Sequence, residues 1–479
     1  MRRRWLVAAT AVMGLAAFGC SEPLKHPASS SATSPPSLPT PADRPTRVSP
    51  TPTPGQTHSM PLALIVHATR FAADVPVGQA RGVMADGGTR WSDIGQRGGR
   101  MRVVTTNNRS AKSVIQAVRG SDEVLGLLPA EAVDPTVRVL TVGGRHPLRD
   151  PKGYPLETTS AREVPEVTTL AAVGDIMLGR RVGSRHAEDP AAPLQPLSRR
   201  LAAAEITVGN FESTLSTDGS PTQGGDSFSA SPRVLPGLRA AGFDVISLAN
   251  NHVGDYGTQA LRQTLSRFAN GDIATVGAGR NVIEARRPVI MERDGVRVGF
   301  LATDSIGETP AATKSRPGTN RLNMPPRTGP LNQAQLRRIS SDISALTRRV
   351  DTVVVLTHWG AQYTHRPEPS QRTAARAFAD AGADLIIGGH PHWVQGWEMA
   401  GSAVVVHSLG NFIFDMDFQT KTREGVFLEV VLWGGSVKAV EAVPYAIDQS
   451  FTPRPVRGQR AASTLADVSS TSRGPYARS

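Results

Sequence analysis

The sequence predicts an α/β protein, and three observations lead to this fold class. Apolar runs typical of buried strands alternate with amphipathic helical segments, which is the rhythm of a doubly wound fold. Several of these runs are followed at once by carboxylate, amide or imidazole side chains. Such side chains collect beyond the carboxyl ends of buried parallel strands. We therefore expect a polar functional site at one edge of a sheet.

The length and the charge of the chain limit the number of domains and the kind of partner. The chain has 479 residues, of which 39% are hydrophobic, and its formal net charge is +12. This length allows two or three domains. The positive charge indicates either arginines spread over a large surface or attraction to an anionic polymer of the cell surface. No nucleic-acid-binding module is recognisable, so nucleic acid is not an expected partner, and the oligomeric state stays open.

Residues 1–20 (MRRRWLVAATAVMGLAAFGC) have a cationic start and a short apolar core, which predicts a secretion signal rather than a membrane span. Cys20 is the only cysteine, so no intramolecular disulfide can form. Its position after the apolar core resembles the lipidated cysteine of bacterial lipoproteins. This predicts a lipid anchor on the extracytoplasmic face of the cell membrane. The alternative is an ordinary signal peptide and a secreted protein.

Residues 21–58 are rich in Ser, Thr and Pro and predict a disordered tether, with folded sequence starting near Pro61. Residues 60–150 then read as a small α/β domain of unknown role. Its second half loosely resembles part of a periplasmic solute-binding domain. The alternative, which we favour, is that the domain has a structural or spacing role.

Within this small domain, alternating apolar residues predict strands over 62–70, 101–107 and 137–144. The segment 110–120 predicts a helix with Val114, Ile115 and Val118 on one face.

The second domain, residues 166–447, carries the chemistry. Its apolar runs predict strands in LAAVGD, ITVGNFE, DVISLANNH, VVVLTHWG, LIIGGHPH and AVVVHSLGNFIFD. Between two of them, residues 256–273 predict a helix with Leu261, Leu265 and Phe268 along one side.

The polar residues that follow these runs are suited to a pair of divalent metal ions beside an open, water-accessible position. His390 and His392 are separated by one residue, and in an extended loop they project to opposite sides, which suits either two adjacent metals or one metal and the substrate. The candidate residues are Asp175, Glu212, Asn251, His252, His358, His390 and His392.

Six motifs in order resemble one family. They are GDIMLGR, NFESTLS, SLANNHVGDYG, THWGAQYTHRPEPSQ, GADLIIGGHPHWVQGWE and VHSLGNFIFD, and they span roughly residues 168–447. Together they are similar to the CapA family of bacterial capsule (poly-γ-glutamate) synthesis proteins. The resemblance implies the calcineurin-like metallophosphoesterase fold, a four-layer αββα sandwich with the metal site at the strand ends.

The resemblance also implies a role for each candidate. Asp175 and His392 would bind a first metal, Glu212 would bridge, and His252 would act as general acid or electrostatic stabiliser. Asn251, His358 and His390 would bind the second metal. The cofactor implied is one or two divalent ions, of Mn, Fe, Zn or Mg.

Four positions depart from the superfamily pattern. Met177 stands where phosphoesterases have a histidine, so the first metal lacks one ligand. Glu212 stands where a bridging aspartate is more usual, and Gln362 stands where relatives often have a glutamate. Gly389 stands where many relatives have an additional histidine.

Two further residues are candidates for substrate binding. Arg366 lies in a basic loop with His365 and Arg372, and guanidinium groups pair with carboxylates; a solvated loop is the alternative. Asn411 follows the last apolar run, where it either contacts substrate or hydrogen-bonds a turn. Residues 448–479 predict one short helix packed on the domain before a disordered end.

Two functions fit these features. The first is an extracytoplasmic metal-dependent hydrolase or transferase acting on an anionic polymer such as poly-γ-glutamate, or on a phosphoester. The second is a non-catalytic lipoprotein that uses the same fold to bind or guide a polymer during assembly.

Overall fold

The computed structural model describes residues 57–86, 90–107 and 109–478. The signal sequence expected over residues 1–20, Cys20 and nearly all of the expected tether lie outside the described residues. The first strand begins at His58, slightly before Pro61. In the part of the chain that is described, no helix has the length and apolarity needed to cross a membrane.

The small domain is built on a five-stranded sheet with the order β3-β4-β1-β5, in which β7 also pairs with β1. Because β7 belongs to it, the sheet extends beyond residue 150, where we expected the domain to end. The strands are β1 (His58–His67), β3 (Arg102–Thr105), β4 (Val124–Pro129), β5 (Val137–Val139) and β7 (Glu157–Ser160).

Two sequence predictions in this domain had different outcomes. The predicted helix appears as α2 (Ala111–Arg119), with Val114, Ile115 and Val118 buried as their spacing predicted. The single strand predicted over 137–144 is instead two strands, because the chain leaves β1 at Leu140 and pairs next with β2. The remaining elements are β2 (Asp74–Val75), α1 (Val77–Asp86), η1 (Trp91–Ile94), η2 (Ala130–Ala132) and β6 (Thr141–Val142).

The large domain contains two stacked sheets. The first has eight strands in the order β13-β12-β9-β8-β23-β24-β25, with β22 paired to β8. Four neighbouring strands, β8, β9, β12 and β13, run parallel to one another, and β23 runs antiparallel to β8. The bounds are β8 (Val167–Ile176), β9 (Ile206–Phe211), β12 (Phe243–Ser247), β13 (Ala274–Val276), β22 (Asn411–Ile413), β23 (Glu424–Trp433), β24 (Ser436–Ile447) and β25 (Pro453–Pro455).

The second sheet has six strands in the order β15-β16-β18-β19-β21-β20, and β16, β18, β19 and β21 are parallel. The bounds are β15 (Val289–Arg293), β16 (Val296–Asp304), β18 (Thr352–His358), β19 (Leu385–Gly389), β20 (Trp397–Ala400) and β21 (Ala403–Val406). Short strand pairs in the loops are β10 (Thr214–Leu215) with β11 (Ser229–Ala230), and β14 (Ala278–Gly279) with β17 (Gly318–Thr319).

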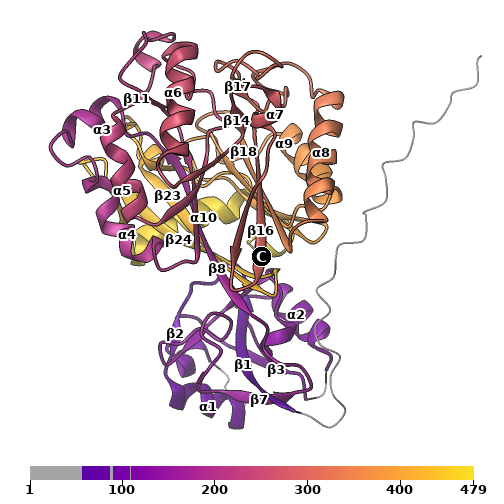
Figure 1. Ribbon diagram of the computed structural model, residues 1–479. Coiled ribbons are helices and arrows are strands. Elements are labelled where there is room, and N and C mark those ends of the chain that lie inside the picture. Colours follow the sequence, from indigo (N-terminus) through magenta and orange to yellow (C-terminus); the bar gives the residue numbers. More distant parts are fainter. Residues whose placement is uncertain (1–56, 87–89, 108, 479) are drawn as a thin grey trace, which may run out of the picture. The chain divides into compact units, whose positions relative to one another are not determined.

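Helices cover the outer face of each sheet, so that the domain has four layers (Figure 1). The strand β8 shows why: Ala171 and Val173 face the helices, whereas Leu170 and Ala172 face the second sheet. The four-layer αββα sandwich is therefore confirmed. The helices are α3 (Arg180–Arg185), α4 (Gln195–Leu201), α5 (Leu235–Ala240) and α6 (Gly257–Ala269) on one side, and α7 (Val282–Ala285), α8 (Gln333–Thr347) and α9 (Pro369–Asp380) toward the other.

The C-terminal segment forms the helix that the sequence predicted, α10 (Gly458–Thr471). The expectation of a disordered end was wrong for the residues that follow it. Tyr476 is buried in η7 (Gly474–Tyr476), and its hydroxyl donates a hydrogen bond of 2.8 Å to the carbonyl of Pro135. A buried aromatic with a satisfied hydroxyl fixes the tail against the fold.

Candidate metal centre

The candidate ligands converge at one edge of the sandwich, where strands of both sheets end. His358 is the last residue of β18, and His390 follows β19 directly. The side chains are buried, although their residues are far apart in sequence. The buried set is Asp175, Glu212, Asn251, His252, His358, His390, His392 and Asn411.

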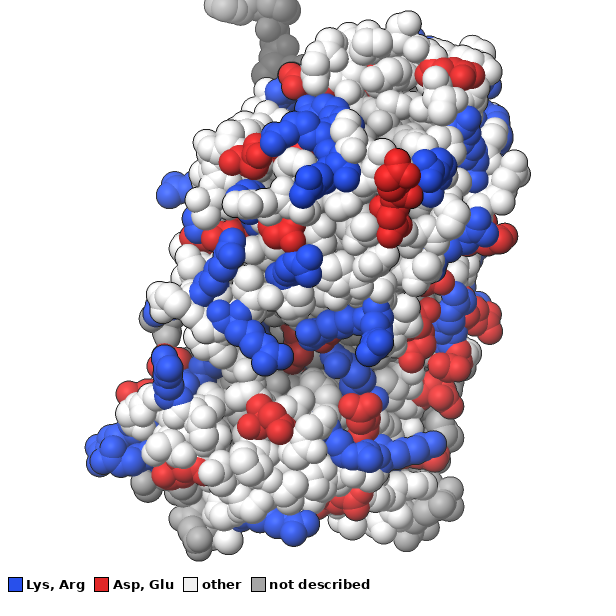
Figure 2. Space-filling model, turned by 90° about the vertical axis from the view of Figure 1, so that its left-hand side faces the viewer, with Lys and Arg blue, Asp and Glu red and all other residues white. Residues whose placement is uncertain are grey.

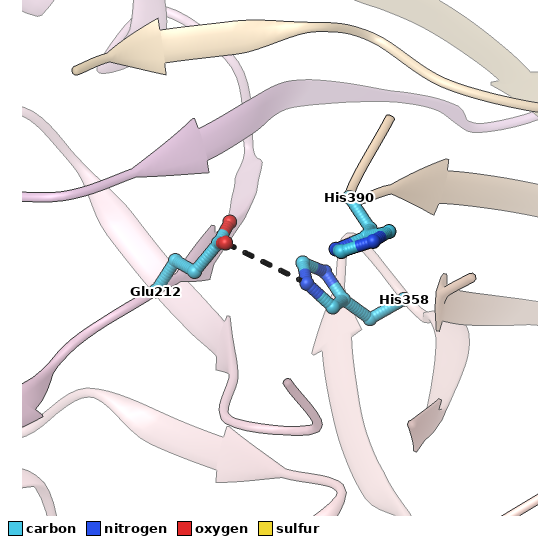
Figure 3. Close-up of side chains that lie close together, drawn as sticks. All are labelled: Glu212, His358 and His390. Atoms are coloured by element: carbon cyan, nitrogen blue, oxygen red, sulfur yellow. Dashed lines mark ion pairs between the residues drawn. The ribbon is translucent and has the colours of Figure 1, made fainter. Parts of the chain in front are cut away.

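The side chains form two groups with the spacing of metal ligands. Glu212, His358 and His390 have ligand atoms within 4.8 Å of one another, and so do Asp175, Glu212 and His392. Figure 3 shows the first group, in which Glu212 Oε1 lies 3.6 Å from His358 Nε2. Glu212 belongs to both groups, which is the arrangement of a carboxylate between two ions.

Several polar atoms in these groups lack a partner. Within the described residues, Glu212 Oε1, both ring nitrogens of His390 and His392 Nε2 are buried without a hydrogen bond. A buried unpaired polar atom costs about 1–3 kcal/mol, so native proteins seldom leave one without cause. Four such atoms in one cluster fit a site for divalent cations.

The protonation states support this interpretation. Burial raises the pKa of Asp175 to about 6, although hydrogen bonds from Asn210 and His390 oppose the shift. Burial and the charge of Asp175 raise the pKa of Glu212 well above its ordinary value. Burial also lowers the pKa of His392 to about 4. Without a cation, the site favours neutral side chains; a divalent ion favours ionised carboxylates and neutral imidazoles.

A layer of amides orients the ligands. Asn210 Nδ2 donates to Asp175 Oδ1 at 2.8 Å, and Asn250 Nδ2 donates to Asn210 Oδ1 at 3.0 Å. Asn251 Oδ1 lies 2.9 Å from His358 Nε2. These contacts fix the direction of each ligand, as outer partners do in metal sites.

Asn411 belongs to this layer rather than to an open substrate surface. Its Oδ1 lies 2.8 Å from His392 Nδ1, and its Nδ2 donates to the carbonyl of Thr422 at 3.0 Å. His392 Nδ1 also lies 3.8 Å from Asp175 Oδ2, and among the described residues His392 Nε2 has no hydrogen-bond partner. Asn411 is fully buried, so it is placed to orient His392.

His252 is held by a residue that the sequence analysis missed. Its Nδ1 lies 2.7 Å from Asp255 Oδ2, and a carboxylate only accepts, so Nδ1 carries the proton. The ring stacks on Phe228 at 3.7 Å, and Nε2 lies 3.8 Å from Glu212 Oε1. The available signal was the aspartate three residues after the histidine in NHVGD.

The His-Pro-His turn is not the extended loop that the sequence predicted. His390 has φ 91° and His392 has φ 58°, values that are uncommon for residues with a side chain. The backbone N–H of His390 donates to Asp175 Oδ2 at 3.0 Å and fixes this conformation. The two histidines still fall into different ligand groups, so the turn supplies both.

Two of the four departures from the superfamily pattern, Met177 and Gly389, are explained by their packing. Met177 is buried in the apolar cluster under the helices, where its sulfur accepts the N–H of Gly179 at 3.2 Å. A Cβ at Gly389 would lie 2.5 Å from Asp175 Oδ1, so no larger residue fits without moving that ligand.

The basic loop is not brought into the centre. Arg366 is exposed, and the described residues show no contact between it and the ligand groups. His365 Nδ1 contacts the carbonyl of Val394 at 2.7 Å, and Arg372 pairs with Glu398. Two of the three basic residues, His365 and Arg372, thus contact other parts of the protein and not the ligand groups.

Two stacked sheets flanked by helices, with paired ligand groups at their common edge, define a calcineurin-like metallophosphoesterase fold. Within that class the chain belongs to the family described as Bacterial capsule synthesis protein PGA_cap, whose sequence model matches residues 169–416. The family predicted from the six motifs is thereby confirmed.

Two relatives match this chain over more than half of its length. The chain is 35% identical to Capsule biosynthesis protein CapA of Bacillus anthracis, over 61% of this chain and 70% of that protein. It is 32% identical to PGA biosynthesis protein CapA of Bacillus subtilis (strain 168), over 61% and 74%. The structure of a 5'-nucleotidase precursor from Thermus thermophilus is similar with a TM-score of 0.34 and 14% identity, covering 60% of this chain and 56% of that one.

Proposed function

We propose that this protein acts outside the cytoplasm as a metal-dependent hydrolase or transferase in the synthesis or processing of an anionic polymer such as poly-γ-glutamate. The names of the two Bacillus relatives, which refer to capsule and to PGA biosynthesis, support the process. The observation that carries the catalytic part is Glu212, which is shared by two buried ligand groups with unpartnered atoms.

The donor set fits divalent ions of borderline hardness, since it combines carboxylates with imidazoles. Glu212, His358 and His390, with Asn251 beside His358, would hold one ion, and Asp175, Glu212 and His392 would hold the other. Ions bound there supply Lewis acidity, which promotes ionisation of water and offsets negative charge on a substrate oxygen.

The protein itself supplies proton handling at His252. Asp255 keeps the proton on Nδ1, and stacking on Phe228 fixes the ring plane. Nε2 therefore faces Glu212 and can deliver or receive a proton at a substrate oxygen in the centre.

One observation favours a second function, a non-catalytic polymer-binding or assembly lipoprotein. Met177 is packed in the apolar core, so the group of Asp175 and His392 has no additional protein ligand from that position. A weakly bound first ion would leave an incomplete catalytic centre that still binds polymer.

Metal analysis of the reconstituted full chain, with hydrolysis assays on poly-γ-glutamate and on p-nitrophenyl phosphate, separates the two functions. The enzyme is expected to retain at least about one metal equivalent. Asp175→Ala should lower the metal content, whereas His252→Ala should retain metal and lose activity by about 10²- to 10⁴-fold. Less than about 0.2 equivalents, or unchanged activity in both variants, would favour the assembly role.

We also propose the location and the partner. A lipid at Cys20 would anchor the protein on the extracytoplasmic face of the cell membrane, with a secreted protein as the alternative. Figure 2 shows lysines and arginines distributed over one face and interspersed with acidic side chains, so attraction to an anionic polymer would be diffuse on that face.

A further inference from the structure

A series of aromatic rings leads from the metal centre to solvent. The ring of Tyr363 lies 6.0 Å from the ring of His392 in a stacked arrangement, with an interplanar angle of 28°. Phe418 lies 5.5 Å from Tyr363, edge to face. The side chain of Phe418 is 60% exposed, and it is one of four large hydrophobic side chains among the described residues that are substantially exposed. The two rings therefore extend from His392 to the protein surface.

Tyr363 is held there at a conformational cost. Its φ is 60°, in the left-handed region, where a bulky side chain is an outlier that costs about 1–3 kcal/mol. Its N–H donates to the carbonyl of Pro391 at 2.9 Å, inside the His-Pro-His turn. This hydrogen bond holds Tyr363 against the segment that supplies two of the candidate metal ligands, in spite of the strain.

The Tyr363 hydroxyl is available as a hydrogen-bond donor. The residue is half-buried, and among the described residues its hydroxyl has no protein partner. Burial raises the pKa of Tyr363, and the negative charges of Asp226 and Glu212 add to the shift. A tyrosine hydroxyl is protonated at neutral pH, so it can donate a hydrogen bond to a bound molecule.

A guanidinium group lies near the same centre, on the side of His252. Arg180 pairs with Asp415 through two nitrogens and lies 4.3 Å above the ring of Phe228, whose ring stacks on His252. Because Asp415 already engages this guanidinium, the groups that remain for a substrate are two aromatic rings and one hydroxyl donor, which suit a chain in which methylene groups alternate with hydrogen-bond acceptors.

We propose that Tyr363 and Phe418 form a substrate subsite, in which the rings pack on the methylene groups of an anionic polyamide and the Tyr363 hydroxyl donates a hydrogen bond to one of its oxygens. The subsite rests on the proposed function, because it names the substrate of the same centre. Tyr363 also positions His392 through ring contact.

The test uses the full chain with Mn²⁺ and a fluorescein-labelled poly-γ-glutamate oligomer, whose dissociation constant is measured by anisotropy. Tyr363→Phe removes only the hydroxyl and should weaken binding about 3- to 10-fold, since one hydrogen bond contributes about 1 kcal/mol. Phe418→Ala should weaken it about 2- to 10-fold through lost ring contact. Metal content should stay unchanged in both variants.

Tyr363→Gly separates strain from function. Glycine accepts φ 60° without strain, so this variant should unfold at the same temperature as wild type or higher, yet bind the oligomer at least about 10-fold more weakly. A residue with a purely structural role would show lower stability instead.

Two controls match these changes. Asp294→Gly relieves a positive φ of 49° in an exposed hairpin turn, and Phe71→Ala removes a phenylalanine that is 50% exposed in the small domain. Neither should change affinity.

The outcomes are distinct. If wild type binds and Tyr363→Gly and Phe418→Ala bind equally well, the subsite is refuted and the proposed function stands. If wild type does not bind the oligomer, both the polymer substrate and the subsite are refuted.

Discussion

At the residue scale, the buried carboxylate of Asp175 makes the metal-free protein sensitive to pH. Burial raises the folded-state pKa of Asp175 from 3.8 to about 6. Below pH 3.8 the Asp175 carboxyl is protonated in both the folded and the unfolded protein, and it then contributes fully to stability. As the pH rises toward the folded-state pKa, the unfolded protein loses this proton first, so the contribution of Asp175 to the free energy of unfolding decreases.

We therefore predict that the free energy of unfolding of the chelator-treated protein contains a term that decreases between pH 3.8 and about 6, and that Asp175→Asn lacks this term. Urea unfolding across this range measures it, with the exposed Asp272→Asn as control. Parallel pH profiles for wild type and Asp175→Asn would contradict the prediction.

Asp255 is predicted to act through His252. Asp255→Asn removes the acceptor that keeps the proton on His252 Nδ1. We expect kcat to fall about 10- to 100-fold, the usual cost of removing such an orienting group, with metal content unchanged. Steady-state kinetics and metal analysis check this, and a loss of metal with activity would instead indicate a collapse of the site.

At the element scale, the junction of β8 and β22 positions Asp175, the first candidate ligand. A Cβ at Gly174 would lie 1.9 Å from the carbonyl oxygen of Gly410, and the N–H of Asp175 donates to the same oxygen at 3.2 Å. Only glycine permits this approach of the two strands.

Gly174→Ala should therefore cost more than about 3 kcal/mol of stability and lower metal affinity, because the clash involves backbone that cannot move aside. Thermal unfolding and metal titration test it. Gly225→Ala is the matched control, since nothing lies within 4 Å of its Cβ position. Equal stability of the two variants would be evidence against the close approach.

Elements with a clear period were predictable from sequence. The helix over 256–273 appears as α6, with Leu261, Leu265 and Phe268 buried on one side. The division of 137–144 into two strands was not predictable, because it depends on pairing with residues 74–75, far away in sequence.

At the scale of the whole molecule, the small domain shares a core with the large one. Trp433, in β23, lies in the same apolar cluster as Met60 and Leu148, and its Nε1 donates to the carbonyl of Leu148 at 2.7 Å. The two domains are thus expected to unfold together.

Trp433→Ala should cost about 3–5 kcal/mol and divide one calorimetric transition into two, because the buried ring couples the domains. Ile283→Ala, at a side chain that is 72% exposed, is the control. A single transition in Trp433→Ala would show that the coupling resides elsewhere.

Membrane attachment is a prediction from sequence alone, since Cys20 lies outside the described residues. Cys20→Ala should release the protein from the membrane fraction, because stable anchoring requires the acyl chains. Fractionation with immunoblotting measures this, and equal retention of the variant would refute the anchor.

Local patterns in the sequence were sufficient to identify the fold class, the family and the candidate ligands, because apolar periodicity and the residues after each run are local properties of the chain. The folded structure was needed to show which ligands share a group, that Asn411 orients His392, and that Asp255 and Tyr363 join the centre. It also placed Met177 in the apolar core and Arg366 in solvent. The direction of a side chain depends on contacts with residues distant in sequence, and local patterns carry no record of those contacts.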